Sequence, residues 1–217
     1  MCEIPSNVVL AEEFAKIFDL DLSKKWIGFL PGSREMEINK MLPIFLKTIQ
    51  QFENEEYEFI ISKSRAIKHQ LFMSYIDLSK IKVKIIDGHN YEMMKYSDFL
   101  TVTSGTATLE AAYLQTPLIV IYKAAKISYE IAKKLVRIKY IGLPNIIAEK
   151  EIVPELIQEN ADPIIIYNKI KYYLDNEDAM NEIKENLLEI KELLTDLKPS
   201  QKVADLIEKV LRDSVWN

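Results

Sequence analysis

The sequence predicts an α/β fold, namely a Rossmann-like parallel sheet of five or six strands with helices on both faces and a helical C-terminal tail. Two observations carry this prediction. Apolar runs of strand length alternate with stretches of helical period along the chain, which is typical of parallel strands joined by crossover helices. The run 118–122 is also apolar throughout, as expected of a strand that is buried on both faces.

The first half of the sheet begins with a strand at residues 26–30, which the breaker pair Pro31-Gly32 ends. A helix follows, because apolar side chains recur at helical spacing in Ile38, Met41, Leu42, Phe45 and Ile49. The alternation then predicts a strand at 57–61, a helix around 66–75, a strand at 83–86 and a short helix around 91–96.

The second half of the sheet has strands at 99–102 and 118–122, separated by a helix over 108–114 that ends before Thr116-Pro117. Beyond residue 125 we expect a basic amphipathic helix to about 137, a loop through Gly142-Leu143-Pro144-Asn145, and then mostly helix. We expect the tail to pack against the domain through an apolar stripe at three- and four-residue spacing, made of Met180, Ile183, Leu187, Ile190, Leu194 and Leu197.

The 217 residues are read as a single domain, with residues 1–25 as a lead-in segment and 165–217 as the helical tail. A net charge of -5 argues against a nucleic-acid partner. Two histidines and one cysteine leave too few ligands for a zinc site, so we expect neither a metal nor a cofactor. No leader pattern opens the chain and no apolar run reaches the roughly 20 residues of a membrane span, so we expect a cytoplasmic chain.

Two loops at strand ends could bind an anion, because parallel sheets bind ligands where strands run into helix N-termini. In the first, Gly32 allows close backbone approach, Ser33 offers a hydroxyl at the helix start, and Arg34 can contact a phosphate with two donors. In the second, Ser104, Gly105, Thr106 and Thr108 offer donors to a diphosphate. Together the two loops predict a nucleotide-diphosphate site.

Glu110 lies one helical turn beyond the second loop and could accept hydrogen bonds from the two hydroxyls of a ribose. Each loop also has a simpler interpretation. Serine and threonine cap ordinary helices, and Arg34 with Glu37 could be a surface ion pair. Neither common phosphate-loop motif, G-x-x-x-x-G-K-[ST] or G-x-G-x-x-G, occurs in the chain, which disfavours a P-loop ATPase.

Three blocks of residues in order resemble the lipid-A-disaccharide synthase family. The first is Leu30-Pro31-Gly32-Ser33-Arg34 with Glu37-Ile38 and Leu42-Pro43. The second, and most specific, runs from Ser104 to Ala112 and includes Thr116-Pro117 and Tyr122-Lys123. The third is Leu143-Pro144-Asn145-Ile146 with residues 153–158. The resemblance spans about residues 26–165 and implies one half of a glycosyltransferase built from two facing Rossmann-like domains, the GT-B type.

The resemblance implies a reaction and a donor. The family transfers a diacylated glucosamine from its uridine-diphosphate donor onto diacylglucosamine 1-phosphate, which makes the β-1,6 lipid A disaccharide with inversion and without a metal. The UDP-acylglucosamine is a substrate and not a cofactor. By resemblance, Ser104, Gly105 and Thr106 hold phosphates and Glu110 holds the ribose, while Arg34 stabilises the leaving diphosphate in the transition state.

The third block contributes further expected contacts to the donor. By resemblance, Asn145 and Gln158 contact its phosphate or sugar region. Glu155 is either a ligand to the sugar or a partner at the N-terminus of its own helix. In this family the general base belongs to an N-terminal acceptor domain that we expect to be absent from these residues. No catalytic base is therefore assigned here, and the chain alone is expected to bind the nucleotide weakly without turnover.

A basic stretch interleaved with apolar residues could place the chain on an anionic membrane surface at the inner face of the inner membrane, as a peripheral protein. The alternative is a solvated helix face. The stretch contains Lys123, Lys126, Lys133, Lys134, Arg137 and Lys139. A tail that crosses to a second copy would make a homodimer.

Two other classes of function stay open. A nucleotide-sugar 2-epimerase or the peptidoglycan lipid-intermediate transferase would share the fold but should have a glycine pair in place of Ser104-Gly105-Thr106. A non-catalytic nucleotide-binding module that pairs with a separate domain is the other alternative. The remaining polar candidates favour structural interpretations. We expect His89 to be a turn residue and Asp98 a turn or cap residue, and His69 receives no role.

Overall fold

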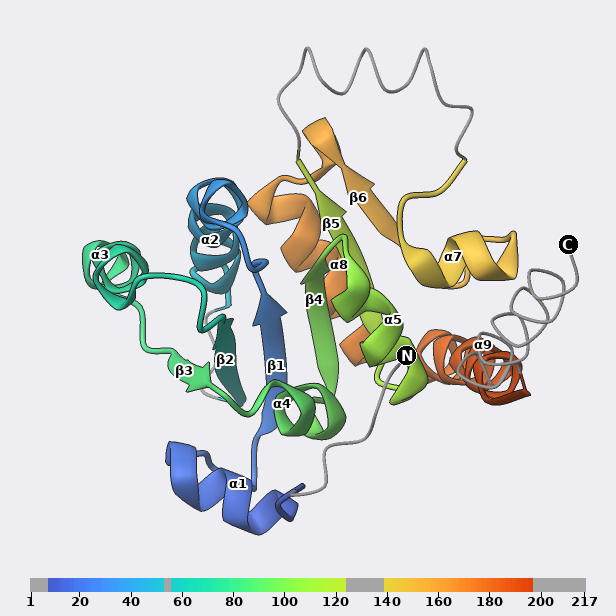
Figure 1. The fold of residues 1–217 in the computed structure, drawn as a ribbon, viewed down its shortest axis with the longest axis horizontal. Coiled ribbons are helices and arrows are strands. Elements are labelled where there is room, and N and C mark those ends of the chain that lie inside the picture. Colours follow the sequence, from blue (N-terminus) through green and yellow to red (C-terminus); the bar gives the residue numbers. More distant parts are fainter. Residues whose placement is uncertain (1–7, 53–55, 124–138, 197–217) are drawn as a thin grey trace, which may run out of the picture.

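The computed structural model describes residues 8–52, 56–123 and 139–196, and its centre is a six-stranded sheet (Figure 1). The strand order is β3-β2-β1-β4-β5-β6, and every neighbouring pair is parallel. The predicted parallel sheet is confirmed, with the larger of the two expected strand numbers. The strands are β1 (Lys25–Leu30), β2 (Tyr57–Lys63), β3 (Lys84–Asp87), β4 (Phe99–Thr103), β5 (Leu118–Tyr122) and β6 (Glu155–Ile157).

Helices cover both faces of the sheet, and in Figure 1 α4 and α5 lie in front of it while α8 lies behind. The front layer holds α1 (Ala11–Phe18), α4 (Asn90–Tyr96), α5 (Thr106–Tyr113), α7 (Leu143–Ala148) and α9 (Glu177–Asp196). The rear layer holds α2 (Glu35–Ile49), α3 (His69–Ser79) and α8 (Pro163–Asp175). Each layer has its own apolar core against the sheet.

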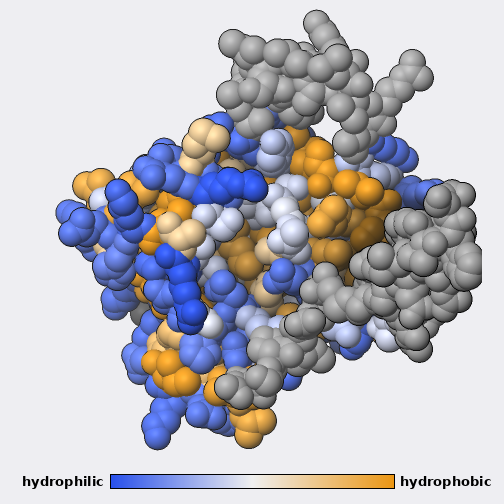
Figure 2. All heavy atoms as spheres, viewed as in Figure 1, coloured by the Kyte–Doolittle hydropathy of each residue, from blue (hydrophilic) through white to orange (hydrophobic). Residues whose placement is uncertain are grey.

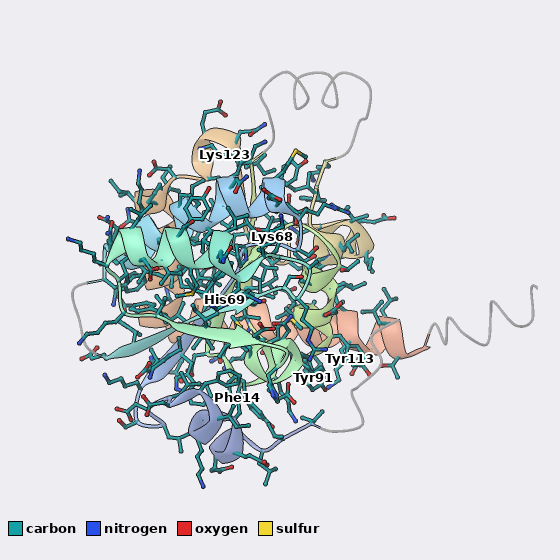
Figure 3. All side chains as sticks on the ribbon, turned by 60° about the vertical axis from the view of Figure 1, so that its left-hand side comes forward. Phe14, Lys68, His69, Tyr91, Tyr113 and Lys123 are labelled. Atoms are coloured by element: carbon teal, nitrogen blue, oxygen red, sulfur yellow. The ribbon has the colours of Figure 1, made fainter. Side chains whose placement is uncertain are left out.

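Close packing of the front layer depends on a glycine in β1. A Cβ at Gly28 would lie 2.5 Å from Leu100 Cδ2 and 2.9 Å from Ser97 Oγ. Any larger residue would therefore push β1 away from the end of α4. At the lower edge in Figure 3, Phe14 of α1 points toward the sheet, where its ring lies 5.9 Å from that of Trp26.

The sheet places a ligand crevice between β1 and β4. The chain leaves β1 for α2 in the rear layer and leaves β4 for α5 in the front layer. The two connections diverge from adjacent carboxyl ends, so the loops there are not covered by a crossover helix. This is the point at which open parallel sheets bind their ligands.

Two local predictions were wrong. The helix predicted around 66–75 begins only at His69, because Ile67 N donates to Ser64 O in a turn that precedes it. The lead-in segment, for which no element was predicted, contains α1. The expected loop at Gly142-Leu143-Pro144-Asn145 is the start of α7, with Gly142 at the N-cap and Pro144 in the first turn. Proline is favourable there because the first amides of a helix have no acceptor.

As far as residue 196, the tail forms the helices α8 and α9, and the predicted stripe is a packing face where it lies on α9. Ile183, Leu187 and Ile190 are buried in the front core. An aspartate fixes the start of α8, because Asp162 Oδ1 accepts from Ile164 N at 2.9 Å. Leu197 and the residues after it lie outside the described part of the chain. The expected basic helix over 125–137 also lies outside it.

Among the residues that the structure describes, none offers a hydrogen-bond partner to the hydroxyl of Thr101, although Thr101 is fully buried on β4. A buried hydroxyl without a partner lowers stability, so Thr101→Val should raise the free energy of unfolding by about 1 kcal/mol. Urea unfolding followed by circular dichroism measures this change. Thr48 is an equally buried control whose hydroxyl donates to Ile44 O at 3.0 Å. Thr48→Val should therefore give no gain, and equal effects of the two variants would contradict the prediction.

Candidate functional site

A hollow of about 390 Å³ lies at the carboxyl ends of the central strands, and it brings the two predicted loops together. Figure 2 shows pale residues of intermediate hydropathy in the middle of this face, with an orange area over α7 beside them. The hollow is lined by Leu30, Gly32, Ser33, Arg34, Glu37, Ser62, Ser64, Asn90, Thr103, Ser104, Gly105, Thr106, Ala107 and Glu110. Seven of the site residues predicted from the sequence thus meet at one place in space.

The loop after β1 is held by Glu37. The carboxylate Oε2 accepts from Ser33 N at 2.8 Å and from Arg34 N at 3.1 Å. Gly32 makes this possible, because its φ is +110° and a Cβ would lie 2.3 Å from Glu37 Oε2. The expected N-cap hydroxyl of Ser33 is wrong, since the N-cap residue is Arg34 and the acceptor is Glu37. A carboxylate accepts more strongly than a hydroxyl and replaces it here.

Arg34 lies at the rim of the hollow and forms an exposed ion pair. Its Nη1 donates to Glu37 Oε1 at 3.0 Å, and its side chain is 79% exposed. The surface pair considered from the sequence is therefore present. A guanidinium has five donors, and a single contact to Glu37 leaves most of them for a ligand in the hollow.

The loop after β4 presents backbone amides to the hollow. Gly105 is the N-cap of α5, and no side chain caps this helix. The amides of Thr106 and Ala107 lie in the first turn, where a helix supplies no acceptor. Thr108 does not line the hollow; it is buried, and its hydroxyl donates to Gly105 O at 2.7 Å. The loop thus combines free amides with a hydroxyl that holds their backbone in place.

Ser104 and Glu110 flank these amides. Ser104 Oγ donates to Ile141 O at 2.9 Å, which ties the loop to the segment before α7. Glu110 lines the hollow one turn into α5. Among the described residues, no side chain or amide donates to its carboxylate. The carboxylate is therefore available to hydroxyl donors from a ligand.

The third group of predicted residues lies outside the hollow. Asn145 is fully buried; its Nδ2 donates to Val153 O and Glu155 Oε1, and its Oδ1 accepts from Ile152 N and Val153 N, all within 3.0 Å. Both donors of Nδ2 and both lone pairs of Oδ1 are therefore used within the protein. Gln158 is also buried, at the first position of the 3₁₀ helix η1 (Gln158–Asn160), and does not line the hollow.

Glu155 lies on β6, so the prediction that it begins a helix of its own was wrong. Its carboxylate accepts from Ile141 N and Gly142 N at 2.9 Å each. These are amides at the start of α7, which comes earlier in the chain. The carboxylate therefore stabilises a neighbouring helix start, where negative charge is favourable.

Three residues that line the hollow were not singled out from the sequence, namely Ser62, Ser64 and Asn90. They lie at or after the ends of β2 and β3. The rule that ligands bind at the carboxyl ends of parallel strands applies to them as well. A polar residue at a strand end was the available signal, but it is weaker than a glycine loop.

The structural interpretations of the remaining polar candidates agree with their surroundings. Asp98 Oδ2 accepts from Trp26 N at 2.8 Å, at the amino end of the sheet and away from the hollow. His89 lies against Phe18, with 5.5 Å between ring centroids, and its Nδ1 is 3.6 Å from Glu92 Oε2. His69 is exposed at the first position of α3 (Figure 3).

A second hollow of about 260 Å³ lies between α8, α9 and the residues before β6. Tyr172, Tyr173 and Lys169 line it together with Glu151 and Glu182. Burial raises the pKa of the Tyr173 hydroxyl, and Tyr172 adds to this effect. The lining of this hollow mixes both signs of charge. No described strand-to-helix loop lines it, so it lacks the amides of such a loop, which favour a diphosphate.

The residues that the structure describes also bear on metal sites and membrane spans. No group of three or more His, Cys, Asp or Glu side chains in that part of the chain could hold a metal ion. Within the same residues, no helix has the length and apolar character required to cross a membrane.

Comparisons with known proteins concern the sequence family and the fold of this chain. The family model described as lipid-A-disaccharide synthetase matches residues 4–208. The lipid-A-disaccharide synthase of Persephonella marina is 36% identical over 205 residues, which cover 92% of this chain and 54% of that protein. That of a Sulfurihydrogenibium species is 35% identical over 212 residues, with 92% and 55% covered. The chain thus spans about half the length of these curated relatives.

The fold is similar to one half of solved GT-B glycosyltransferases. The structure of the wall teichoic acid polymerase superimposes with a TM-score of 0.55 at 21% sequence identity, over 95% of this chain and 48% of that chain. At this identity the likeness concerns the fold alone. It confirms the expected Rossmann-like half of a two-domain architecture.

Proposed function

The chain belongs to the lipid-A-disaccharide synthetase family, and on that premise we propose that it carries the half that binds the uridine-diphosphate sugar donor. The observation that supports this most is the hollow in which the Arg34 loop, the Ser104 loop and Glu110 meet. Sequence motifs that lie about 70 residues apart contribute to one lining. This convergence fits a diphosphate with an attached ribose better than two independent helix caps.

The donor's diphosphate would lie against the first turn of α5. The amides of Thr106 and Ala107 and the hydroxyl of Thr106 are the donors at this place, and the helix dipole favours negative charge there. The hydroxyl of Ser104 donates to Ile141 O, so Ser104 positions the loop in this proposal. A Cβ at Gly105 would point into open space, since its nearest atom would be Thr103 O at 3.9 Å. Because glycine has no Cβ, a phosphate can use this space to approach the backbone closely. The ribose hydroxyls would donate to Glu110, whose carboxylate has no other partner among the described residues.

Departure of uridine diphosphate requires that negative charge be stabilised on its terminal phosphate. We assign this role to the α5 amides and Arg34, in place of a metal ion. Arg34 can contact a phosphate oxygen with guanidinium donors that Glu37 does not occupy. The amides of Ser33 and Arg34 already donate to the Glu37 carboxylate. The first loop therefore contributes the Arg34 side chain to the phosphate and not its backbone amides.

The third block supports the site from outside in this proposal. Asn145 and Glu155 fix the segment 141–145, to which Ser104 is bonded. Their earlier assignment as donor contacts is replaced by this positioning role. Gln158 stays a proposed contact only to the sugar end of a bound donor, because it lies at the carboxyl end of β6.

The whole reaction in this family would use a second half that binds diacylglucosamine 1-phosphate and supplies the general base. The product would be the β-1,6 disaccharide of lipid A, formed with inversion. The acyl substrates favour a site at the inner face of the inner membrane, with the basic stretch from Lys123 to Lys139 against anionic lipid. Residues 124–138 of that stretch lie outside the described part of the chain.

Calorimetric titration of the chain with uridine diphosphate and adenosine diphosphate tests the proposal. We expect saturable binding with a preference for the uridine nucleotide. Glu110→Ala should weaken that binding by about 10- to 100-fold, because hydrogen bonds to a charged group contribute about 1.5 to 3 kcal/mol.

Glu13→Ala is the matched control, since Glu13 is exposed on α1 and lies outside the hollow. It should bind the nucleotide as the unchanged chain does. Absence of saturable uridine diphosphate binding would contradict a donor site formed by these residues. Equal losses in both variants would contradict the assignment of Glu110.

A further inference from the structure

Ser62 and Asn90 form a polar pair in the wall of the hollow, and neither belongs to the loops described above. Ser62 lies near the carboxyl end of β2, and Asn90 is the first residue of α4. Ser62 Oγ donates to Asn90 Oδ1 at 3.0 Å. Ser62 is 6% exposed, yet both residues line the hollow. The pair therefore presents polar atoms to a ligand from a largely buried position.

The pairing of β2 with β3 holds the Ser62–Asn90 pair in place, because Ser62 lies on β2 and Asn90 follows β3. Next to Ser62, Lys63 Nζ donates to Asp87 Oδ2 at 2.6 Å, and the Lys63 side chain is only 6% exposed. Lys63 and Asp87 are register partners in β2 and β3. The Asp87 side chain is 48% exposed, so the pair joins a buried lysine to a half-exposed carboxylate. Because this contact and the strand register link the two strand ends, they hold Ser62 near Asn90 before any ligand binds.

The position of the pair relative to Glu110 suggests which part of a nucleotide it meets. Asn90 begins α4 and Glu110 lies on α5, and both helices cover the front face of the sheet. Arg34 begins α2 on the rear face. If the ribose contacts Glu110 and the phosphates contact the α5 amides and Arg34, the base extends along the front face, on the side of α4. Asn90 and Ser62 are the polar side chains that line the hollow there.

We propose that Ser62 and Asn90 recognise the edge of the uracil base, an inference that rests on the proposed function. With Asn90 Oδ1 accepting from Ser62, the Asn90 Nδ2 group donates to the O4 carbonyl of uracil. A lone pair of Ser62 Oγ accepts from the N3–H group. The N3–H donor of the base thus faces an acceptor and its O4 acceptor faces a donor, so the pair determines specificity and takes no part in bond making.

Asn90→Asp tests this assignment, because a carboxylate accepts but cannot donate. It cannot pair with the O4 of uracil, whereas it can accept from the 4-amino group of cytosine. We expect the affinity for uridine diphosphate to fall about tenfold and that for cytidine diphosphate to rise. The ratio of the two affinities, measured by titration calorimetry on the 217-residue chain, should change by more than tenfold.

Two variants separate this role from a structural one. Asn181→Asp makes the same charge change at an exposed position of α9 and should leave the ratio unchanged. Ser62→Ala should weaken both nucleotides without reversing the preference. If the unchanged chain prefers uridine diphosphate and Asn90→Asp keeps that ratio, base recognition by this pair is wrong while the donor site stands. If the unchanged chain binds neither nucleotide, the proposed function fails and this proposal fails with it.

Discussion

Asn145→Ala is expected to lower the free energy of unfolding by about 3 kcal/mol or more. The amide makes four hydrogen bonds at a fully buried position. Its removal leaves the amides of Ile152 and Val153 without a partner, and each buried group without one costs about 1 to 3 kcal/mol. Urea or thermal unfolding of the purified chain gives the value directly.

Asn181→Ala is the control, because Asn181 is exposed on α9 and should change stability by no more than about 0.5 kcal/mol. The same experiment decides between two roles for Asn145. An unchanged unfolding midpoint combined with lost nucleotide binding would mean that Asn145 contacts the donor. A lower unfolding midpoint supports the positioning role if the variant still binds the nucleotide at temperatures or urea concentrations well below that midpoint.

Gly32→Ala should disrupt the first loop and reduce nucleotide affinity at least tenfold. The φ of Gly32 is +110°, a conformation that costs a residue with a Cβ about 1 to 3 kcal/mol. The added Cβ would also lie 2.8 Å from Glu37 Cβ. The carboxylate would have to leave Ser33 N and Arg34 N, and Arg34 would lose its place at the rim. Unfolding and nucleotide titration measure the two effects.

Gly105→Ala is the matched control for stability. The φ of Gly105 is 164°, in the extended region, and the nearest atom to an added Cβ is 3.9 Å away. The variant should unfold like the unchanged chain. Similar destabilisation by both substitutions would show that the φ of Gly32 is not the cause.

The layers of the fold could be predicted from the sequence because strand and helix periods are local properties. The wholly apolar run at β5 and the spaced apolar residues of α2 needed no tertiary information. The α7 helix was missed because glycine and proline favour loops on average, while its start is stabilised by Glu155, which lies 13 residues from Gly142. β6 has only three residues, too few for a periodic signal.

The candidate site could be predicted in part. Gly32, Ser33, Arg34, Ser104, Gly105, Thr106 and Glu110 all line one hollow, as the rule for strand ends requires. That rule does not tell a side chain that faces a ligand from one that faces the protein. Asn145 and Glu155 carry the same polar groups as a ligand contact, yet those groups point at backbone amides. Only the packing of β6 beside β5 determines that orientation.

The hydrogen bonds from Ser104 through Ile141 to Glu155 make the two walls of the hollow unequal in stiffness. The wall at the start of α5 is connected through these hydrogen bonds to β6, to the start of α7 and to the buried Asn145 amide. The opposite wall ends in the Arg34 side chain, which has a single exposed contact. A ligand would therefore contact a rigid loop at the start of α5 on one side and the mobile Arg34 side chain on the other. Conformational change on binding should be concentrated in the Arg34 side chain, while the α5 amides that bind the phosphates keep their geometry.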